Sequence, residues 1–151
     1  MKSLPADAET RKIAELAAQA LFANDRASAN LGITIESVAP GRARLRMTVR
    51  ADMVNGHGIC HGGMVFALAD SAFAVACNTY NAVTVAAAAS IDFLAPAHVD
   101  DELTAEAREL WRSRRSGIYE ISVSNQRGET MALFRGRSHC LGGPLVAGPK
   151  A

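Results

Sequence analysis

Residues 55–63, NGHGICHGG, lead directly into residues 64–78, MVFALADSAFAVACN, and together they decide the fold. The first part is polar and rich in glycine, as a loop requires. The second part is almost wholly apolar and contains no proline, and its residues favour or tolerate a helix. A helix that is apolar on every face is a buried helix, and this one is too short to span a bilayer. We therefore expect one buried central helix with the rest of the chain around it.

Asp70 is the one ionisable side chain inside this apolar segment. A lone carboxylate among apolar neighbours is costly unless it is paired, hydrogen-bonded or used in chemistry. One interpretation is structural, with the carboxylate bonded to nearby backbone or to an arginine. The other is functional, because perturbed carboxylates gather at active sites.

Gly62 and Gly63 open the predicted helix. A helix N-terminus leaves backbone N–H groups unpaired and carries a partial positive charge. Glycine lets another molecule approach this backbone closely. The pair could therefore bind an anion, or a carbonyl oxygen that becomes one in a transition state. The alternative is an ordinary entry from a loop into a helix.

His57, Cys60 and His61 in the loop invite two further hypotheses. A metal site is disfavoured, because the loop supplies no further ligands at a known spacing. A Cys-His nucleophile pair is also disfavoured, because adjacent residues seldom present their side chains to each other. We expect no metal, and we expect His61 to shape the turn or to bond backbone near the site.

Composition indicates a single domain, residues 1–151, with flexible tails at 1–8 and 143–151. The chain is 49% apolar, which argues against disorder. Its net charge of +1 gives no broad basic surface for nucleic acid, and it has neither an apolar signal segment nor a membrane-spanning run. Its three cysteines cannot all pair, so we expect a reduced, cytoplasmic protein.

The remaining segments predict a sheet and one more helix. Apolar residues recur at helical spacing from Glu9 to about Asn24. The alanine-rich segment 82–95 is flanked by β-branched and aromatic residues, which favours a strand over a helix. The predicted strands are a hairpin over 31–50 that turns at Pro40-Gly41, then 82–95, 102–113, 117–125 and 129–141.

The run N-G-H-G-x-C-H-G-G-M-x-F-x-L-A-D-S-A-F-A-x-A-C-N resembles the hotdog-fold acyl-CoA thioesterases of the phenylacetate-degradation type. SIDFLAPA at 90–97 and ALFRGRSH at 132–139 resemble later strands of that family, so the likeness covers about 25–142. It implies an α+β hotdog fold, a long central helix wrapped by a curved antiparallel sheet of five to six strands. It also implies subunits paired into dimers, and usually tetramers as dimers of dimers.

The same resemblance implies hydrolysis of acyl-CoA thioesters, with phenylacetyl or a ring-hydroxylated relative as the acyl group. The family's catalytic carboxylate matches Asp70, and its thioester-polarising glycine amide matches the Gly62-Gly63 turn. Asn55 matches an active-site asparagine. Coenzyme A is then part of the substrate, and no separate cofactor is implied. Phe66 and Phe73 are candidates for the acyl pocket, although both could equally belong to the core.

Arg135, Arg137 and His139 share one face of the last strand by period two. They could contact the phosphates of coenzyme A, or they could form an exposed or interface surface.

Helix geometry adds an expectation about assembly. Gly63 and Asp70 are seven residues apart, so they share a helix face but lie about 10 Å apart along the axis. Reacting groups need to approach within about 3–3.5 Å. Two antiparallel helices across a two-fold axis would place Asp70 of one chain beside the glycine turn of the other. We therefore expect composite active sites, two per dimer.

Three rival functions remain open. Another hotdog chemistry, such as a dehydratase or hydratase acting on acyl thioesters, would use a histidine with an acidic partner placed elsewhere. A non-catalytic acyl-CoA-binding protein would keep a pocket and a dimer without needing Asp70. A purely structural domain would need neither.

Overall fold

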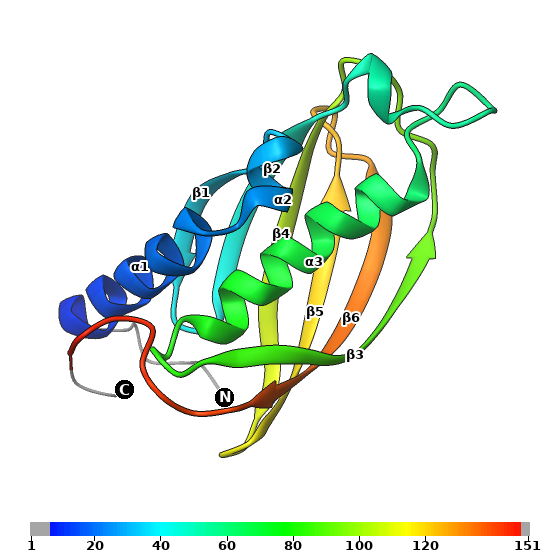
Figure 1. Ribbon diagram of the computed structural model, residues 1–151. Coiled ribbons are helices and arrows are strands. Elements are labelled where there is room, and N and C mark those ends of the chain that lie inside the picture. Colours follow the sequence, from blue (N-terminus) through cyan, green and yellow to red (C-terminus); the bar gives the residue numbers. More distant parts are fainter. Residues whose placement is uncertain (1–6, 149–151) are drawn as a thin grey trace.

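The computed structural model describes residues 7–148 as three α-helices and a six-stranded antiparallel sheet in the order β1-β2-β4-β5-β6-β3. The sheet curves around α3, which runs across its concave side, and α1 and α2 lie at the β1 edge (Figure 1). This confirms the expected α+β architecture. The helices are α1 (Ala8–Ala23), α2 (Arg26–Asn30) and α3 (Gly62–Asn78), and the strands are β1 (Thr34–Ala39), β2 (Arg42–Thr48), β3 (Thr84–Phe93), β4 (Glu102–Arg112), β5 (Ser116–Ser124) and β6 (Thr130–Cys140).

The core lies between α3 and the concave face of the sheet. Alternate residues of the central strands point toward α3 and are fully buried, as period-two patterning predicts. The Phe73 ring on α3 packs against Tyr119 and Phe134, with ring centroids 5.5 and 5.9 Å away. It also lies against Gly136, where a Cβ atom would stand 2.7 Å from the ring. Glycine on β6 therefore lets the sheet approach the helix closely.

The face of α3 that carries Asp70 departs from the sequence prediction. The helix is not buried on every side, because Ala67, Asp70, Ser71 and Ala74 remain half-exposed and Gly63 is exposed. These residues recur at intervals of three and four, so they form one stripe along the helix. The other faces are covered by the sheet and by α1. The single chain thus leaves one side of its central helix open.

Side-chain hydrogen bonds fix the C-terminal end of α3 to the sheet. Asn78 accepts a hydrogen bond from the Thr84 N–H at 2.9 Å and donates one to the Thr84 carbonyl at 2.8 Å. Thr79 Oγ1 accepts from the Gly41 N–H in the β1–β2 turn at 2.8 Å. These bonds hold the start of β3 and the hairpin turn at one end of the helix.

Among the described residues, the ten-residue strand β3 stands at the sheet edge and pairs with β6 alone. Residues 85–90 are all exposed, whereas alternate residues of the central strands are buried. A long exposed edge presents a row of unpaired backbone groups and is a template for pairing with another chain. The small alanine side chains that made this segment resemble a helix form part of this exposed edge.

Some local structure was not predicted. The short α2 and a 3₁₀ turn at Ala51–Met53 were missed, because neither is long enough to show a periodic pattern. Parts of the predicted tails make defined contacts, since Asp7 caps α1 and residues 145 and 146 bond to Asn81. Asn81 accepts hydrogen bonds from the N–H groups of Leu145 and Val146 and donates one to the Val146 carbonyl. The predicted tail residues 1–6 and 149–151 lie outside the described residues. Between residues 7 and 148, none of the helices is long and apolar enough to cross a membrane.

Candidate active site

Asp70 lies at the middle of the half-exposed stripe on α3. Within residues 7–148, no donor forms a hydrogen bond to its carboxylate. Partial burial raises the pKa of Asp70 above its ordinary value of 3.8, and the negative charge of Asp25 raises this pKa further. A half-exposed carboxylate without a donor and with a raised pKa is suited to accept a proton from a bound water.

Gly62 and Gly63 differ in how their N–H groups are used. His61 is the N-cap of α3, and its Nδ1 atom accepts a hydrogen bond from the Gly63 N–H at 2.8 Å. The Gly62 N–H has no hydrogen-bond partner among the described residues. His61 therefore shapes the turn, in agreement with the sequence expectation, and it leaves Gly62 as the open donor at the positive end of the helix.

Phe93, at the end of β3, is a neighbour of this turn that sequence reasoning did not identify. A Cβ atom added at Gly62 would lie 3.0 Å from the Phe93 ring. The Phe93 side chain is 56% exposed, so its ring stands at the surface beside the helix N-terminus. Its position within SIDFLAPA gave no spacing signal that would link it to a glycine 31 positions earlier in the sequence.

Asn55 is held in the loop that precedes α3. Its Oδ1 atom accepts hydrogen bonds from the N–H groups of His57 and Ile59, at 2.9 and 3.3 Å. Within residues 7–148, its Nδ2 group has no partner. The loop therefore uses the carbonyl end of the amide and leaves the N–H end free to donate to a ligand.

The alternative chemistries of the loop receive no support from its geometry. The Cys60 side chain is buried, and burial together with the charge of Asp101 raises the pKa of its thiol, which disfavours a reactive thiolate. Nδ1 of His61 is occupied by the Gly63 N–H. No group of three or more His, Cys, Asp or Glu side chains within residues 7–148 could hold a metal ion.

The remaining candidates lie away from Asp70. Arg135, Arg137 and His139 are exposed on the outer face of β6, so they do share one face, and it is the face opposite α3. Phe73 is fully buried, which favours the alternative that it belongs to the core. Phe66 is half-buried and packs edge to face on Phe134, with ring centroids 5.1 Å apart.

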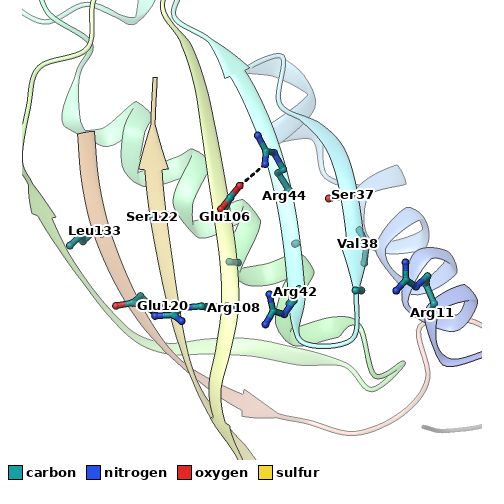
Figure 2. A pocket seen from close by; sticks show the side chains of 13 residues that line it. Arg11, Ser37, Val38, Arg42, Arg44, Glu106, Arg108, Glu120, Ser122 and Leu133 are labelled. Carbon is teal, nitrogen blue, oxygen red and sulfur yellow. Dashed lines mark hydrogen bonds and ion pairs between the residues drawn. The ribbon is translucent and has the colours of Figure 1, made fainter. Parts of the chain in front are cut away.

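A groove of about 700 Å³ lies on the outer face of the sheet and continues to α1 (Figure 2). Arg44 in this groove pairs with Glu106, and Arg108 pairs with Glu120. Neither Asp70 nor Gly62 lines it. We assign the groove to the charged outer surface, because the groups suited to catalysis lie on the other side of the sheet.

One chain does not bring the catalytic candidates together. The helix is continuous from Gly62 to Asn78, so Asp70 stays roughly 10–12 Å along the axis from the glycine turn. Gly62 and Phe93 lie together at the helix N-terminus, Asn55 lies in the loop that precedes it, and Asp70 lies on the open stripe at the middle of the helix. The half-exposed stripe that carries Asp70 is a surface that a second chain could cover.

Comparison with known proteins identifies the family. Residues 57–132 match the model of the thioesterase superfamily. Over 129 residues, covering 85% of this chain and 92% of the relative, the sequence is 48% identical to the acyl-coenzyme A thioesterase PaaI of Escherichia coli K12. Human acyl-coenzyme A thioesterase 13 is 27% identical over 71% of this chain and 79% of its own length.

Solved structures agree with this sequence match. The structure of the E. coli PaaI protein from the phenylacetic acid degradation operon superposes with a TM-score of 0.88 at 46% identity, covering 89% of this chain and 98% of that one. The TT0310 protein of Thermus thermophilus gives a TM-score of 0.75 at 39% identity, covering 78% and 99%. The chain belongs to the thioesterase superfamily and is a hotdog-fold thioesterase of the phenylacetate-degradation type.

Proposed function

We propose that this thioesterase hydrolyses acyl-coenzyme A, with phenylacetyl or ring-hydroxylated phenylacetyl as the acyl group, in aromatic catabolism. The names of the E. coli relatives support the substrate class and the pathway. The observation that carries the chemistry is the half-exposed Asp70 carboxylate, without a donor, on a helix whose first N–H, at Gly62, is also unpaired within residues 7–148. One group can activate a nucleophile and the other can stabilise an oxyanion.

In the proposed reaction the Gly62 N–H and the helix dipole polarise the thioester carbonyl. Asp70 takes a proton from water, the water oxygen bonds to the carbonyl carbon, and the C–S bond breaks to release coenzyme A thiolate, which is then protonated. Alternatively, an Asp70 carboxylate oxygen attacks the carbonyl carbon, the C–S bond breaks to release coenzyme A thiolate, and water hydrolyses the resulting mixed anhydride to the free acid and the Asp70 carboxylate. The Asn55 Nδ2 group would orient the water or the acyl carbonyl. Neither route needs a metal or a resident cofactor.

The active site is proposed to be composite. Pairing β3 with β3 of a second chain would satisfy its exposed edge, and it would cover the open stripe of α3 with the same stripe of the partner. Antiparallel helices then place Asp70 of one chain near Gly62 of the other, so that each dimer has two sites. A dimer of dimers remains our expectation for the full assembly.

Subunit mixing tests the composite site. Asp70→Asn and Gly62→Pro chains, each inactive alone, are unfolded together in a 1:1 ratio and refolded. Random pairing makes half of the dimers mixed, and each mixed dimer has one intact site, so activity should recover to about a quarter of wild type. Free thiol release and native mass spectrometry measure activity and mixing. Mixed dimers that form without activity would show that Asp70 and Gly62 act within one chain.

The substrate class is tested with a panel of phenylacetyl-, hydroxyphenylacetyl-, benzoyl-, short-chain and long-chain acyl-CoAs. We expect free-thiol release with the highest kcat/KM for the aryl-acetyl thioesters, and an aryl ring beside Phe93 and Phe66 would fit this preference. Binding of acyl-CoA without turnover would identify the non-catalytic rival. Hydration of enoyl-CoA without thiol release would identify the hydratase.

Two further expectations concern the binding of the coenzyme A phosphates and the location of the protein in the cell. The outer stripe of Arg135, Arg137 and His139 remains a candidate for the coenzyme A phosphates, provided that a neighbouring subunit brings the nucleotide to that face. Cys60, Cys77 and Cys140 are free thiols, which fits the proposed location in the reducing cytoplasm.

A further inference from the structure

A row of paired residues crosses the outer face of the sheet close to the β4–β5 turn. Trp111 on β4 is paired with Ile118 on β5, and Ile118 is paired with Arg137 on β6. Residues directly opposite each other on neighbouring strands share one face of a sheet. This face is the outer one, because Gly117 and Tyr119, on either side of Ile118, are buried. Trp111 is 55% exposed, and Arg137 is exposed as well.

A β-bulge turns Trp111 toward this outer face. β4 and β5 pair Glu109 with Tyr119 and then Trp111 with Ile118, so Leu110 is an extra residue between the two pairs. Under strict alternation Trp111 would share the inner face with Glu109, whose carboxylate accepts a hydrogen bond from the Tyr119 hydroxyl at 2.8 Å. The extra residue reverses the alternation, and bulges commonly redirect a side chain in this way. A large aromatic ring is therefore held in solvent instead of in the core.

Four arginines lie in or near this row, two on β6 and two in the β4–β5 turn: Arg135, Arg137, Arg114 and Arg115. Within residues 7–148, none of them forms an ion pair with a carboxylate. By contrast, Arg108 in the next row is paired with Glu120 on the same outer face (Figure 2). Several unpaired cations beside one exposed aromatic ring fit a ligand that is both anionic and aromatic.

The row lies near the end of the sheet at which α3 ends. Asn78 of α3 is hydrogen-bonded to Thr84 at the start of β3, and Thr84 is paired with Cys140. The Arg115 carbonyl in the β4–β5 turn accepts a hydrogen bond from the Cys140 N–H at 2.9 Å. Arg137 is three residues from Cys140, so it lies about 10 Å along β6 from this end of the sheet.

The proposed dimer brings a second glycine turn to this end. Because its α3 helices are antiparallel, the C-terminal end of one helix lies beside the Gly62 turn of the other. An acyl-CoA whose carbonyl is held at that turn has a long, flexible pantetheine arm. This arm can pass the β4–β5 turn at the end of the sheet and bring the nucleotide to the outer face, with Arg114 and Arg115 along its path.

We propose that Trp111 and Arg137 form a subsite for the nucleotide end of coenzyme A, which is a 3′-phosphorylated ADP. The adenine stacks on the exposed indole ring, and the phosphates pair with Arg137 and with the arginines of the β4–β5 turn. Two strand spacings, about 10 Å, separate the backbones of Trp111 and Arg137, which leaves room for a base and its sugar over Ile118. This inference rests on the proposed hydrolysis of acyl-CoA and on the proposed dimer.

Fluorescence tests the subsite without turnover, because Trp111 is the only tryptophan in the 151-residue chain. The probes are coenzyme A, adenosine 3′,5′-bisphosphate, which lacks the pantetheine arm, and pantetheine, which lacks the nucleotide. We expect saturable quenching by the first two, weakened by high salt, and none by pantetheine. Calorimetry measures each Kd independently. Coenzyme A that binds without quenching Trp111 would overturn the proposal, and so would equal binding or equal quenching by pantetheine.

Kinetics on a truncated substrate separates nucleotide binding from a structural role. Trp111→Ala should raise KM for phenylacetyl-CoA about five- to a hundredfold and leave kcat nearly unchanged, because it removes one base-stacking ring. Arg137→Ala should raise this KM about tenfold. With S-phenylacetyl-pantetheine, which has no nucleotide, both variants should match wild type, and Trp111→Phe should restore most of the loss with phenylacetyl-CoA. Equal losses on the two substrates would contradict the subsite.

Arg42→Ala is the matched control. Arg42 is another exposed arginine of the outer face that has no ion pair within residues 7–148. It pairs with Arg108, three strand spacings from Arg135 on β6, which is about 14 Å and beyond the screening length at physiological salt. Its KM for phenylacetyl-CoA should stay within about twofold of wild type.

Two outcomes assign the row to something else or isolate the premise. If a second copy of the chain covers this face, Trp111→Ala changes the oligomer in native mass spectrometry and leaves coenzyme A binding unchanged, which overturns the subsite. If wild type hydrolyses no acyl-CoA, the proposed function fails, while the fluorescence result still decides whether coenzyme A binds at Trp111.

Discussion

Asp70→Asn is expected to lower kcat by about 10²–10⁴-fold, the usual contribution of a general base. The amide has nearly the same shape as the carboxylate but cannot take a proton from water or form an anhydride. The fold should be kept, because no hydrogen bond within residues 7–148 reaches the Asp70 carboxylate. KM should therefore change little. Steady-state thiol release on the best acyl-CoA of the panel, from pH 4 to 9, measures the effect.

The pH profile distinguishes loss of the base from loss of the fold. In wild type, kcat/KM should fall as the pH drops through the raised pKa of Asp70, because the protonated carboxyl is inactive. The variant should lack this limb and keep a low, flat rate. A variant that retains full activity would remove Asp70 from the mechanism.

Stability provides the matching control, and its sign is fixed by the same pKa. Because the folded state raises the Asp70 pKa above 3.8, folding favours the protonated form, and this contribution to stability is lost as pH rises through the folded-state pKa. Asp70→Asn should therefore be at least as stable as wild type at neutral pH. The difference should vanish below the unfolded-state pKa, as thermal unfolding at several pH values would reveal.

Gly62→Pro is expected to lower kcat by about 10²–10³-fold, the effect of removing one oxyanion donor. Proline deletes only the N–H, and Gly62 is the first residue of α3, where proline is well tolerated. His61 has φ −58° and ψ 132°, which is the backbone conformation that a residue before proline adopts. No hydrogen bond within the described residues is lost, because the Gly62 N–H has no partner there.

Gly62→Ala is the control for the added bulk. Its Cβ atom would meet the Phe93 ring at 3.0 Å, as the proline ring would, but it keeps the N–H. The Phe93 ring is more than half exposed and can move aside, so we expect Gly62→Ala to retain at least about a tenth of wild-type kcat. If the proline and alanine variants have equal activity, the N–H does not polarise the thioester and steric effects explain both losses.

Much of the fold follows from the sequence because its periodic patterns are long. The apolar run after Gly62-Gly63 predicts the central helix, and period-two alternation predicts most of the strands. For β3 the prediction came from the β-branched and aromatic residues that flank its alanines, together with the family resemblance. Residue type and order make Asp70 and the glycine turn candidates, because a lone carboxylate in an apolar helix is costly, and the family resemblance is what assigns them catalytic roles. These roles stay predictions until the variants are measured.

Other features depend on contacts between distant parts of the chain, which no local pattern records. Only the tertiary structure distinguishes Gly62 from Gly63, because it shows the His61 ring capping the second N–H and not the first. It also places the Phe93 ring beside Gly62. Both observations depend on where a side chain points after folding.

The sequence by itself determined the central helix, the antiparallel strands around it and the order of the chemical groups along it. These features can be predicted because their physical basis is local: burial patterning and helix spacing act over a few residues. The tertiary structure alone decided which backbone groups and which helix surface remain without a partner among the described residues. The open edge of β3, the open stripe of α3 and the row from Trp111 through Ile118 to Arg137 exist only because segments far apart in sequence are packed side by side.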